Sequence, residues 1–247
     1  MTVGFIGCGN IATALATGFD RGGLFADPVE GRAHALAEAT GGRACESNRE
    51  VAEQADIVFL CHKPGQLDEV AADIADVSAT VVSVLAGVSI SRVAAAYPKS
   101  SAYRIIPSVL AEIRGGAIAI ARTAPQAPDE AVRELLASAG VVVELPDELI
   151  DVAMGLMSNA PAYYALIAEA QIDAGVRLGL TADAATQLVL PTMEGAGKLL
   201  HVRGGDTLRV RRSVTSPGGT TARGLDALEK GGLRSAFSRA LDAVLGR

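Results

Sequence analysis

Short apolar runs alternate with amphipathic stretches over the first 145 residues of the chain. Residues 3–6 are expected to form the first strand, and the runs at 57–61 and 80–84 have the continuous pattern expected for parallel strands that are buried on both faces. Further strands are expected at 28–30, 103–106, 117–121 and 141–145, with helices at 11–20, 33–40, 70–74, 90–96 and 129–139. This order predicts a doubly wound α/β sheet, in which ligands bind beyond the carboxyl ends of the strands.

Only helical patterns follow residue 147. Helices are expected at 149–157, 162–178, 182–201 and 222–247. A helical segment of about 100 residues with few large side chains buries little apolar surface by itself. We therefore expect a domain boundary near residue 147 and, over 148–247, an all-helical domain that interleaves with a second copy of the chain in a homodimer.

Small aliphatic residues dominate the composition. Hydrophobic residues make up 49% of the 247 positions, but aromatic residues only 4%. The formal net charge is −6, yet from Lys198 onwards 10 basic residues stand against 4 acidic ones. That basic quarter could attract anionic ligands, or it could match the charge of a neighbouring subunit or domain. The acidic total and the scarcity of aromatic residues argue against nucleic acid as a partner.

Cys8, Cys45 and Cys61 are too few and too scattered for a disulfide framework or a zinc site, so no metal is expected. Cys8 and Cys61 are expected to fill the core. No basic segment precedes the first strand, and the longest nearly apolar run, residues 79–90, is too short to span a bilayer. These features predict a cytoplasmic protein without a membrane segment.

A glycine-rich turn follows the first strand directly. It reads Gly7-Cys8-Gly9-Asn10-Ile11-Ala12 and opens the first helix. In this fingerprint the first glycine permits the tight turn and the second lets the backbone approach a pyrophosphate. A βα turn without a ligand is the alternative. We predict that residues 1–147 form a dinucleotide-binding domain.

The end of the second strand should decide which dinucleotide binds. An acidic residue there holds ribose hydroxyls, whereas an arginine accommodates a 2′-phosphate. Placing that strand at 28–30 brings Glu30 and Arg32 to this position. Because Arg32 opens the next helix just after a glycine, we predict NADPH, with NADH as the alternative.

The most distinctive stretch lies near the C-terminus. Residues 213–221 read Ser-Val-Thr-Ser-Pro-Gly-Gly-Thr-Thr, and a helix is expected to follow. Gly218 and Gly219 can adopt positive φ, so such a turn can point several backbone N–H groups at one spot. That arrangement suits a carboxylate or a phosphate. The chain therefore combines a dinucleotide turn with an anion-binding loop.

These residues resemble the pyrroline-5-carboxylate reductase family, which reduces a cyclic imine with NAD(P)H in proline biosynthesis. The likeness covers nearly the whole chain and includes residues 5–12, 55–64, 83–90, 173–180, 214–221 and 228–232. It implies a Rossmann domain followed by a helical dimerisation domain, with dimers that could join into a larger ring.

The resemblance also implies roles for individual residues. With Arg32, the expected cofactor contacts are Gly7, Gly9, Asn10, Ile11, Asn48, Cys61, Lys63, Pro64 and Ala86. Ser216, Gly218, Gly219, Thr220 and Thr221 would hold the substrate carboxylate. Thr221, at the imine nitrogen, and Ser216 would take part in catalysis; a helix cap is the alternative role for Thr221.

The chain departs from the family pattern around the expected nicotinamide. Residues 107–110 read Pro-Ser-Val-Leu instead of Pro-Asn-Thr-Pro, and residues 157–163 read Met-Ser-Asn-Ala-Pro-Ala-Tyr instead of Ser-Gly-Ser-Gly-Pro-Ala-Tyr. His62 replaces the usual valine before Lys63-Pro64. Reduction of 1-pyrroline-5-carboxylate to L-proline is the expected activity. A reductase for another cyclic imine in secondary metabolism and an inactive NADP-binding homologue are the alternatives.

Overall fold

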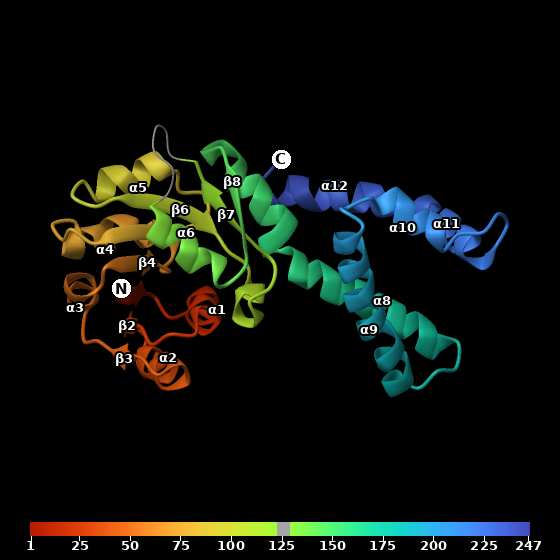
Figure 1. Ribbon diagram of the computed structural model, residues 1–247, viewed down its shortest axis with the longest axis horizontal. Coiled ribbons are helices and arrows are strands. Elements are labelled where there is room, and N and C mark those ends of the chain that lie inside the picture. The colour runs from red at the N-terminus through yellow and green to blue at the C-terminus, as the bar shows by residue number, and fades with distance from the viewer. Residues whose placement is uncertain (123–128) are drawn as a thin grey trace. The chain divides into compact units, whose positions relative to one another are not determined.

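The computed structural model describes residues 1–122 and 129–247 (Figure 1). It contains two compact units, Met1–Pro161 and Ala162–Arg247. The first unit is an α/β structure and the second is wholly helical, so the predicted fold class is confirmed. The boundary near residue 147 stays a prediction, and the division between the compact units lies inside helix α8 (Ala160–Arg177).

The first unit is built on one eight-stranded sheet. Its strands are β1 (Val3–Ile6), β2 (Leu24–Ala26), β3 (Arg43–Ala44), β4 (Ile57–Leu60), β5 (Thr80–Ser83), β6 (Ala102–Ile106), β7 (Ala117–Ala121) and β8 (Val141–Leu145). They lie in the order β3-β2-β1-β4-β5-β6-β7-β8, and only the pair β6–β7 is antiparallel. The carboxyl ends of β1, β2 and β4 therefore meet at the same edge, where the glycine turn begins.

Helices pack on this sheet through small side chains and a few phenylalanines. They are α1 (Asn10–Phe19), α2 (Arg32–Thr40), α3 (Asn48–Gln54), α4 (Leu67–Ile74), α5 (Ile90–Ala96), α6 (Glu130–Ala137) and α7 (Ile150–Ala153). On β1, Phe5 stacks on Phe59 of β4 with ring centroids 5.1 Å apart. A Cβ on Gly18 of α1 would lie 2.1 Å from the Ala111 carbonyl oxygen, so α1 approaches its neighbour more closely than any side chain would allow.

Two of the expected elements are wrong. The second strand is Leu24–Ala26 and not residues 28–30, because Leu24–Ala26 is fully buried in the sheet whereas Pro28 has no N–H for a strand ladder. The C-terminal helix expected at 222–247 is broken at Gly231 and Gly232, and Gly232 has a φ of +78°. The sequence analysis also missed three short elements, β3, α3 and the helix at Thr207–Ser213.

The second unit contains the rest of α8, α9 (Ala182–Val202), α10 (Thr207–Ser213), α11 (Thr220–Lys230) and α12 (Leu233–Val244). Many of its large apolar side chains are exposed in the single chain, among them Leu166 at 64% and Leu188 at 61%. Such surfaces are typical of helices that associate with another subunit. No helix among the described residues is both long and apolar enough to cross a bilayer.

Candidate functional site: a dinucleotide cavity and an anion-binding turn

The turn after β1 requires a glycine at its first position. Gly7 has a φ of +93°, and its N–H donates to the Ala26 carbonyl oxygen of β2 at 2.8 Å. A Cβ at Gly7 would lie 2.7 Å from the carbonyl carbon of Cys61, which follows β4. The turn therefore lies directly against both neighbouring strand ends.

Gly9 leaves open space in front of helix α1. It is the residue before the first turn of this helix, and its φ of −82° is accessible to any residue. A Cβ at Gly9 would meet no atom of the chain within 4 Å. The backbone N–H groups of the first turn of α1, which begins with Asn10, have no partner within the helix, and they favour an anion. This cradle fits the pyrophosphate of a dinucleotide.

A cavity of about 470 Å³ opens beside this turn. It brings together five of the predicted cofactor residues: Gly7, Gly9, Arg32, Cys61 and Lys63. A second cavity of about 270 Å³ adjoins it, shares Gly7, Asp27 and His62 with it, and contains the predicted Asn48. The other four predicted cofactor residues, Asn10, Ile11, Pro64 and Ala86, line neither cavity. Pro64 lines a third hollow with Gly87 and Ser89.

Asp27 is a cavity residue that the sequence analysis missed. It follows β2, and its carboxylate accepts hydrogen bonds from the Cys8 N–H at 2.7 Å and from the Val29 N–H at 2.8 Å. The signal was an acidic residue 20 positions after Gly7, directly behind the run Leu24–Ala26. The sequence analysis overlooks it because the expected strand, 28–30, lies four residues later than the observed one.

His62 lines both cavities and has an unusual environment. Its Nδ1 lies 2.9 Å from the Lys63 carbonyl oxygen, so Nδ1 carries the proton and donates it. Its Nε2 is buried and has no partner among the residues the structure describes. Burial lowers the pKa of His62, which is therefore neutral at neutral pH. With the proton on Nδ1, the Nε2 of this neutral imidazole remains a hydrogen-bond acceptor.

Cys8 and Cys61 act as packing residues. Burial raises the pKa of the Cys8 thiol to about 12, and burial also raises the pKa of Cys61. Both thiols therefore stay protonated and poorly reactive at neutral pH. Among the described residues, no group of three or more His, Cys, Asp or Glu side chains is arranged to hold a metal ion.

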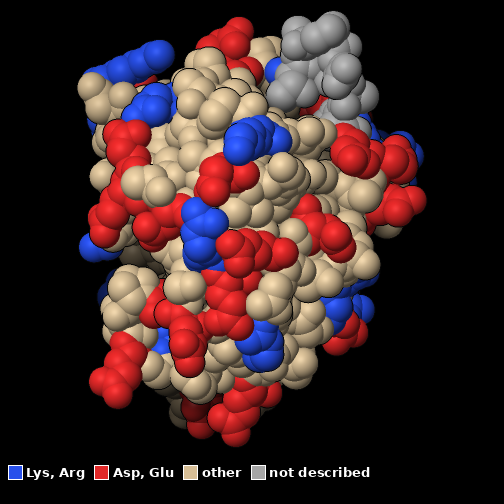
Figure 2. All heavy atoms as spheres, turned by 90° about the vertical axis from the view of Figure 1, so that its left-hand side faces the viewer, with Lys and Arg blue, Asp and Glu red and all other residues tan. Residues whose placement is uncertain are grey.

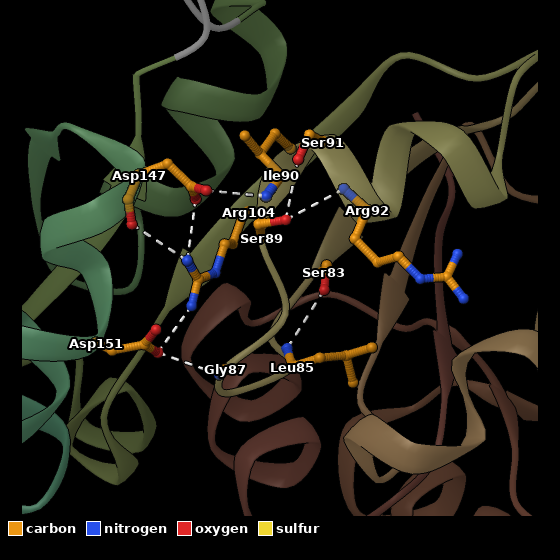
Figure 3. Close-up of polar contacts among 10 residues, drawn as sticks. All are labelled: Ser83, Leu85, Gly87, Ser89, Ile90, Ser91, Arg92, Arg104, Asp147 and Asp151. Carbon is orange, nitrogen blue, oxygen red and sulfur yellow. Dashed lines mark hydrogen bonds and ion pairs between the residues drawn. The ribbon is translucent and has the colours of Figure 1, made fainter. Parts of the chain in front are cut away.

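The loop after β5 contains Ala86 and is fixed by a buried arginine (Figure 3). Arg104 of β6 pairs with Asp147 at 3.0 Å and with Asp151 at 2.7 Å. Asp151 in turn accepts the Gly87 N–H at 3.1 Å, and Asp147 accepts the Ile90 N–H at 3.2 Å. The loop is thereby tied at both of its ends to the segment that follows the sheet.

The predicted anion-binding turn leads into α11 of the second unit. Gly218 has a φ of +69°, and the Gly219 N–H donates to the Ser216 carbonyl oxygen at 3.0 Å. Gly219 is the residue that caps α11, so Thr220 and Thr221 lie in the first turn of the helix and Thr221 is not its cap. The N–H groups of this turn are available to an anion, in agreement with the sequence pattern.

Comparisons with known proteins agree with both halves of this description. A family model described as pyrroline-5-carboxylate reductase dimerisation matches residues 147–247, and one described as NADP oxidoreductase coenzyme F420-dependent matches residues 2–87. The pyrroline-5-carboxylate reductase of Synechocystis sp. is 36% identical over 83% of this chain and 78% of that protein.

Two solved structures are similar over nearly the whole chain. The 1-pyrroline-5-carboxylate reductase of Streptococcus pyogenes has a TM-score of 0.88 and 27% identity, covering 100% of this chain and 97% of its own. The pyrroline carboxylate reductase of Plasmodium falciparum, solved with NADP bound, has the same fold with a TM-score of 0.86 at 24% identity, covering 99% of this chain and 95% of its own. The chain belongs to the pyrroline-5-carboxylate reductase family and is an NAD(P)H-dependent oxidoreductase.

Proposed function

We propose that this protein reduces the C=N bond of 1-pyrroline-5-carboxylate to give L-proline, with NADPH as the hydride donor and NADH as the alternative. The similar proteins from Synechocystis sp. and Streptococcus pyogenes are named as reductases of this substrate. One observation carries the proposal: this chain has both the glycine turn at Gly7, which fits a dinucleotide, and the turn at Gly218, which fits the substrate carboxylate.

The substrate carboxylate is assigned to the turn before α11. The unpaired N–H groups of a helix start and the partial positive charge of the helix dipole favour a carboxylate there. In this proposal the hydroxyls of Ser216 and Thr220 add donors, and the positive φ of Gly218 gives the turn its concave shape. Fixing the carboxylate orients the ring carbon that accepts the hydride.

Thr221 is proposed to act at the imine nitrogen. Once the imine nitrogen is protonated, the carbon of the C=N bond accepts hydride readily. The protein therefore mainly has to orient the substrate ring and stabilise the positive charge of the iminium group. The bound nicotinamide supplies the hydride. The Thr221 hydroxyl hydrogen-bonds the ring nitrogen and relays to it, from water, the one proton that turns the imine into this hydride acceptor, because an alcohol is a poor acid by itself.

We further propose that residues 1–147 and 148–247 form the two functional domains, that the homodimer joins into a ring of dimers, and that the enzyme works in the cytoplasm. The exposed apolar side chains of α8 and α9 and the matched dimerisation model support an assembly through the helical domain. Sedimentation of the purified protein at several concentrations would distinguish a dimer from a larger ring.

The proposed reaction is tested by following the loss of reduced nicotinamide absorbance with the purified protein. We expect oxidation of NADPH with 1-pyrroline-5-carboxylate to be faster than with the homologous six-membered cyclic imino acid. A clear preference for the larger ring would favour the alternative, a reductase of another imine. Binding of NADPH without oxidation for every imine offered would favour an inactive homologue.

One structural observation favours the alternative, a reductase that acts on a different cyclic imine. In the segment that departs from the family pattern, Ser108 is buried, and its Oγ accepts the Leu110 N–H at 3.3 Å. This side chain therefore holds a turn, and it does so where the family pattern has an amide. The imine panel described above decides whether the change affects the choice of substrate.

Replacing Thr221 with valine tests the assigned hydrogen bond. The side chains have nearly the same shape, so the loss of one hydrogen bond should lower kcat about tenfold with little change in the stability of the protein. Thr207→Val, which changes a residue in the first turn of α10, is the matched control and should keep full turnover. Full turnover by Thr221→Val would remove this residue from the mechanism.

Replacing Arg32 with alanine tests the cofactor assignment. Arg32 is exposed, opens α2 and lines the larger cavity. If it binds the 2′-phosphate, Arg32→Ala should raise the Kd for NADPH about tenfold and leave the Kd for NADH nearly unchanged. Arg21→Ala removes the same charge outside the cavity and serves as the control. Equal effects of the two changes would point to overall charge and not to a contact.

A further inference from the structure

The carboxylate of Asp27 is held in a fixed position at the edge of the nucleotide cavities. Its Oδ2 accepts the N–H of Cys8 in the glycine turn, and its Oδ1 accepts the N–H of Val29. These two bonds join the end of β2 to the turn after β1. Each carboxylate oxygen still has a second lone pair, so the group can also accept hydrogen bonds from a ligand hydroxyl.

The surroundings of Asp27 are strongly acidic on one side. The smaller cavity is lined by Glu46, Glu69 and Asp73 in addition to Asp27, and no lysine or arginine occurs among the described residues that line it. Glu69 and Asp73 belong to α4. Figure 2 shows the side of the first unit that carries α3 and α4, where red acidic side chains gather in a broad band. A 2′-phosphate group bound at this end of the site would therefore be repelled by several carboxylates.

Two cations, Arg32 and Lys63, line the larger cavity together with Asp27. Of the two, Arg32 is the one whose charge acts on the glycine turn together with that of Asp27. Burial is the main reason why the pKa of the Cys8 thiol is raised. The negative charge of Asp27 raises this pKa further, and the positive charge of Arg32 lowers it. The two charges therefore act on the same part of the turn in opposite directions.

We infer that Asp27 is the residue that selects against a 2′-phosphate on the adenosine ribose and, by accepting a hydrogen bond from the 2′-hydroxyl, admits NADH to the site. An acidic residue at the end of the second strand holds a ribose hydroxyl in this fold, and it repels a phosphate at the same place. The choice between the two dinucleotides then depends on the balance between Asp27 and Arg32. The inference rests on the proposed use of these cavities for the dinucleotide.

Direct binding of NADH and NADPH tests this role, because the two ligands differ only in the 2′-phosphate. Dissociation constants are measured from nicotinamide fluorescence, without any imine present, for the wild type, Asp27→Asn and Asp27→Ser. Loss of the charge should lower the ratio of Kd for NADPH to Kd for NADH about tenfold. The serine variant keeps an acceptor for the Cys8 N–H, so it provides the test if the asparagine variant does not fold.

Glu30→Gln is the matched control. It removes a nearby exposed charge that lines neither cavity, and the Kd ratio should change less than about twofold. An unchanged ratio in both Asp27 variants, or an equal change in Glu30→Gln, would overturn the inference. Failure of the wild type to bind either dinucleotide would overturn it as well. Binding with the expected shift, but no reduction of any imine, would support the role of Asp27 while the proposed reaction fails.

Discussion

Replacing Arg104 with leucine is expected to lower the free energy of unfolding by about 3–5 kcal/mol. The Arg104 side chain is only 2% exposed, and its guanidinium lies between the carboxylates of Asp147 and Asp151 (Figure 3). Leucine would fill part of the space but would leave two partly buried carboxylates without their cation. The cost therefore comes mainly from the charges that remain and not from the bonds that are lost.

The effect should also reach the loop that contains Ala86. Asp147 and Asp151 accept the N–H groups of Ile90 and Gly87, and without Arg104 both carboxylates would turn towards water or take up protons. Urea unfolding followed by circular dichroism measures the stability change. Arg104→Lys should fall between the wild type and Arg104→Leu, because one ammonium group cannot form the same pair of directed contacts.

Arg92→Leu provides the comparison for an exposed ion pair. Arg92 pairs with Asp68 on the surface, and its side chain is 47% exposed. Exposed pairs of this kind contribute at most about 1 kcal/mol. If Arg92→Leu and Arg104→Leu lowered the free energy of unfolding by the same amount, the buried cluster of Arg104, Asp147 and Asp151 would not be what fixes the loop that contains Ala86.

The sequence predicted the central strands because their signal is local. Residues 57–60 are a continuous apolar run, and residues 80–83 place two valines between a threonine and a serine. Short runs rich in β-branched and apolar residues form buried parallel strands where helices cover both faces of the sheet. The second strand was misplaced because Leu24–Ala26 has only three residues and is stabilised by its neighbours on both sides rather than by its own pattern. That error hid Asp27, whose position depends on where this strand ends.

Only the part of the candidate site that has a local sequence signal could be predicted. Gly7 and Gly9 belong to one short motif, whereas Arg104 meets Asp147 and Asp151 across more than 40 positions of the chain. No local pattern connects an arginine on a strand with carboxylates in a later helical segment. The exposed or buried state of His62 likewise depends on elements that meet only in the folded sheet.

Replacing Gly9 with alanine is expected to weaken cofactor binding strongly and to leave the fold intact, whereas Arg104→Leu destabilises the fold. We expect Gly9→Ala to raise the Kd for NADPH about 100-fold, which corresponds to about 2.7 kcal/mol. The φ of −82° suits alanine, and the new Cβ would meet no atom of the chain within 4 Å. It would instead occupy the space in which the backbone approaches the pyrophosphate. The free energy of unfolding should stay within about 1 kcal/mol of the wild type, because the weaker helix cap is offset by the reduced freedom of the unfolded chain.

Two further glycines make this expectation specific. Gly65 also has open space around its Cβ position but lines neither nucleotide cavity, so Gly65→Ala should keep both stability and NADPH affinity. Gly7→Ala should destabilise the protein, since its φ is +93° and its Cβ would lie 2.7 Å from the carbonyl carbon of Cys61. Calorimetric titration with NADPH and thermal unfolding separate the three variants. Unchanged NADPH affinity in Gly9→Ala would mean that the cofactor does not approach the start of α1, and the assignment of the cavity beside it would be wrong.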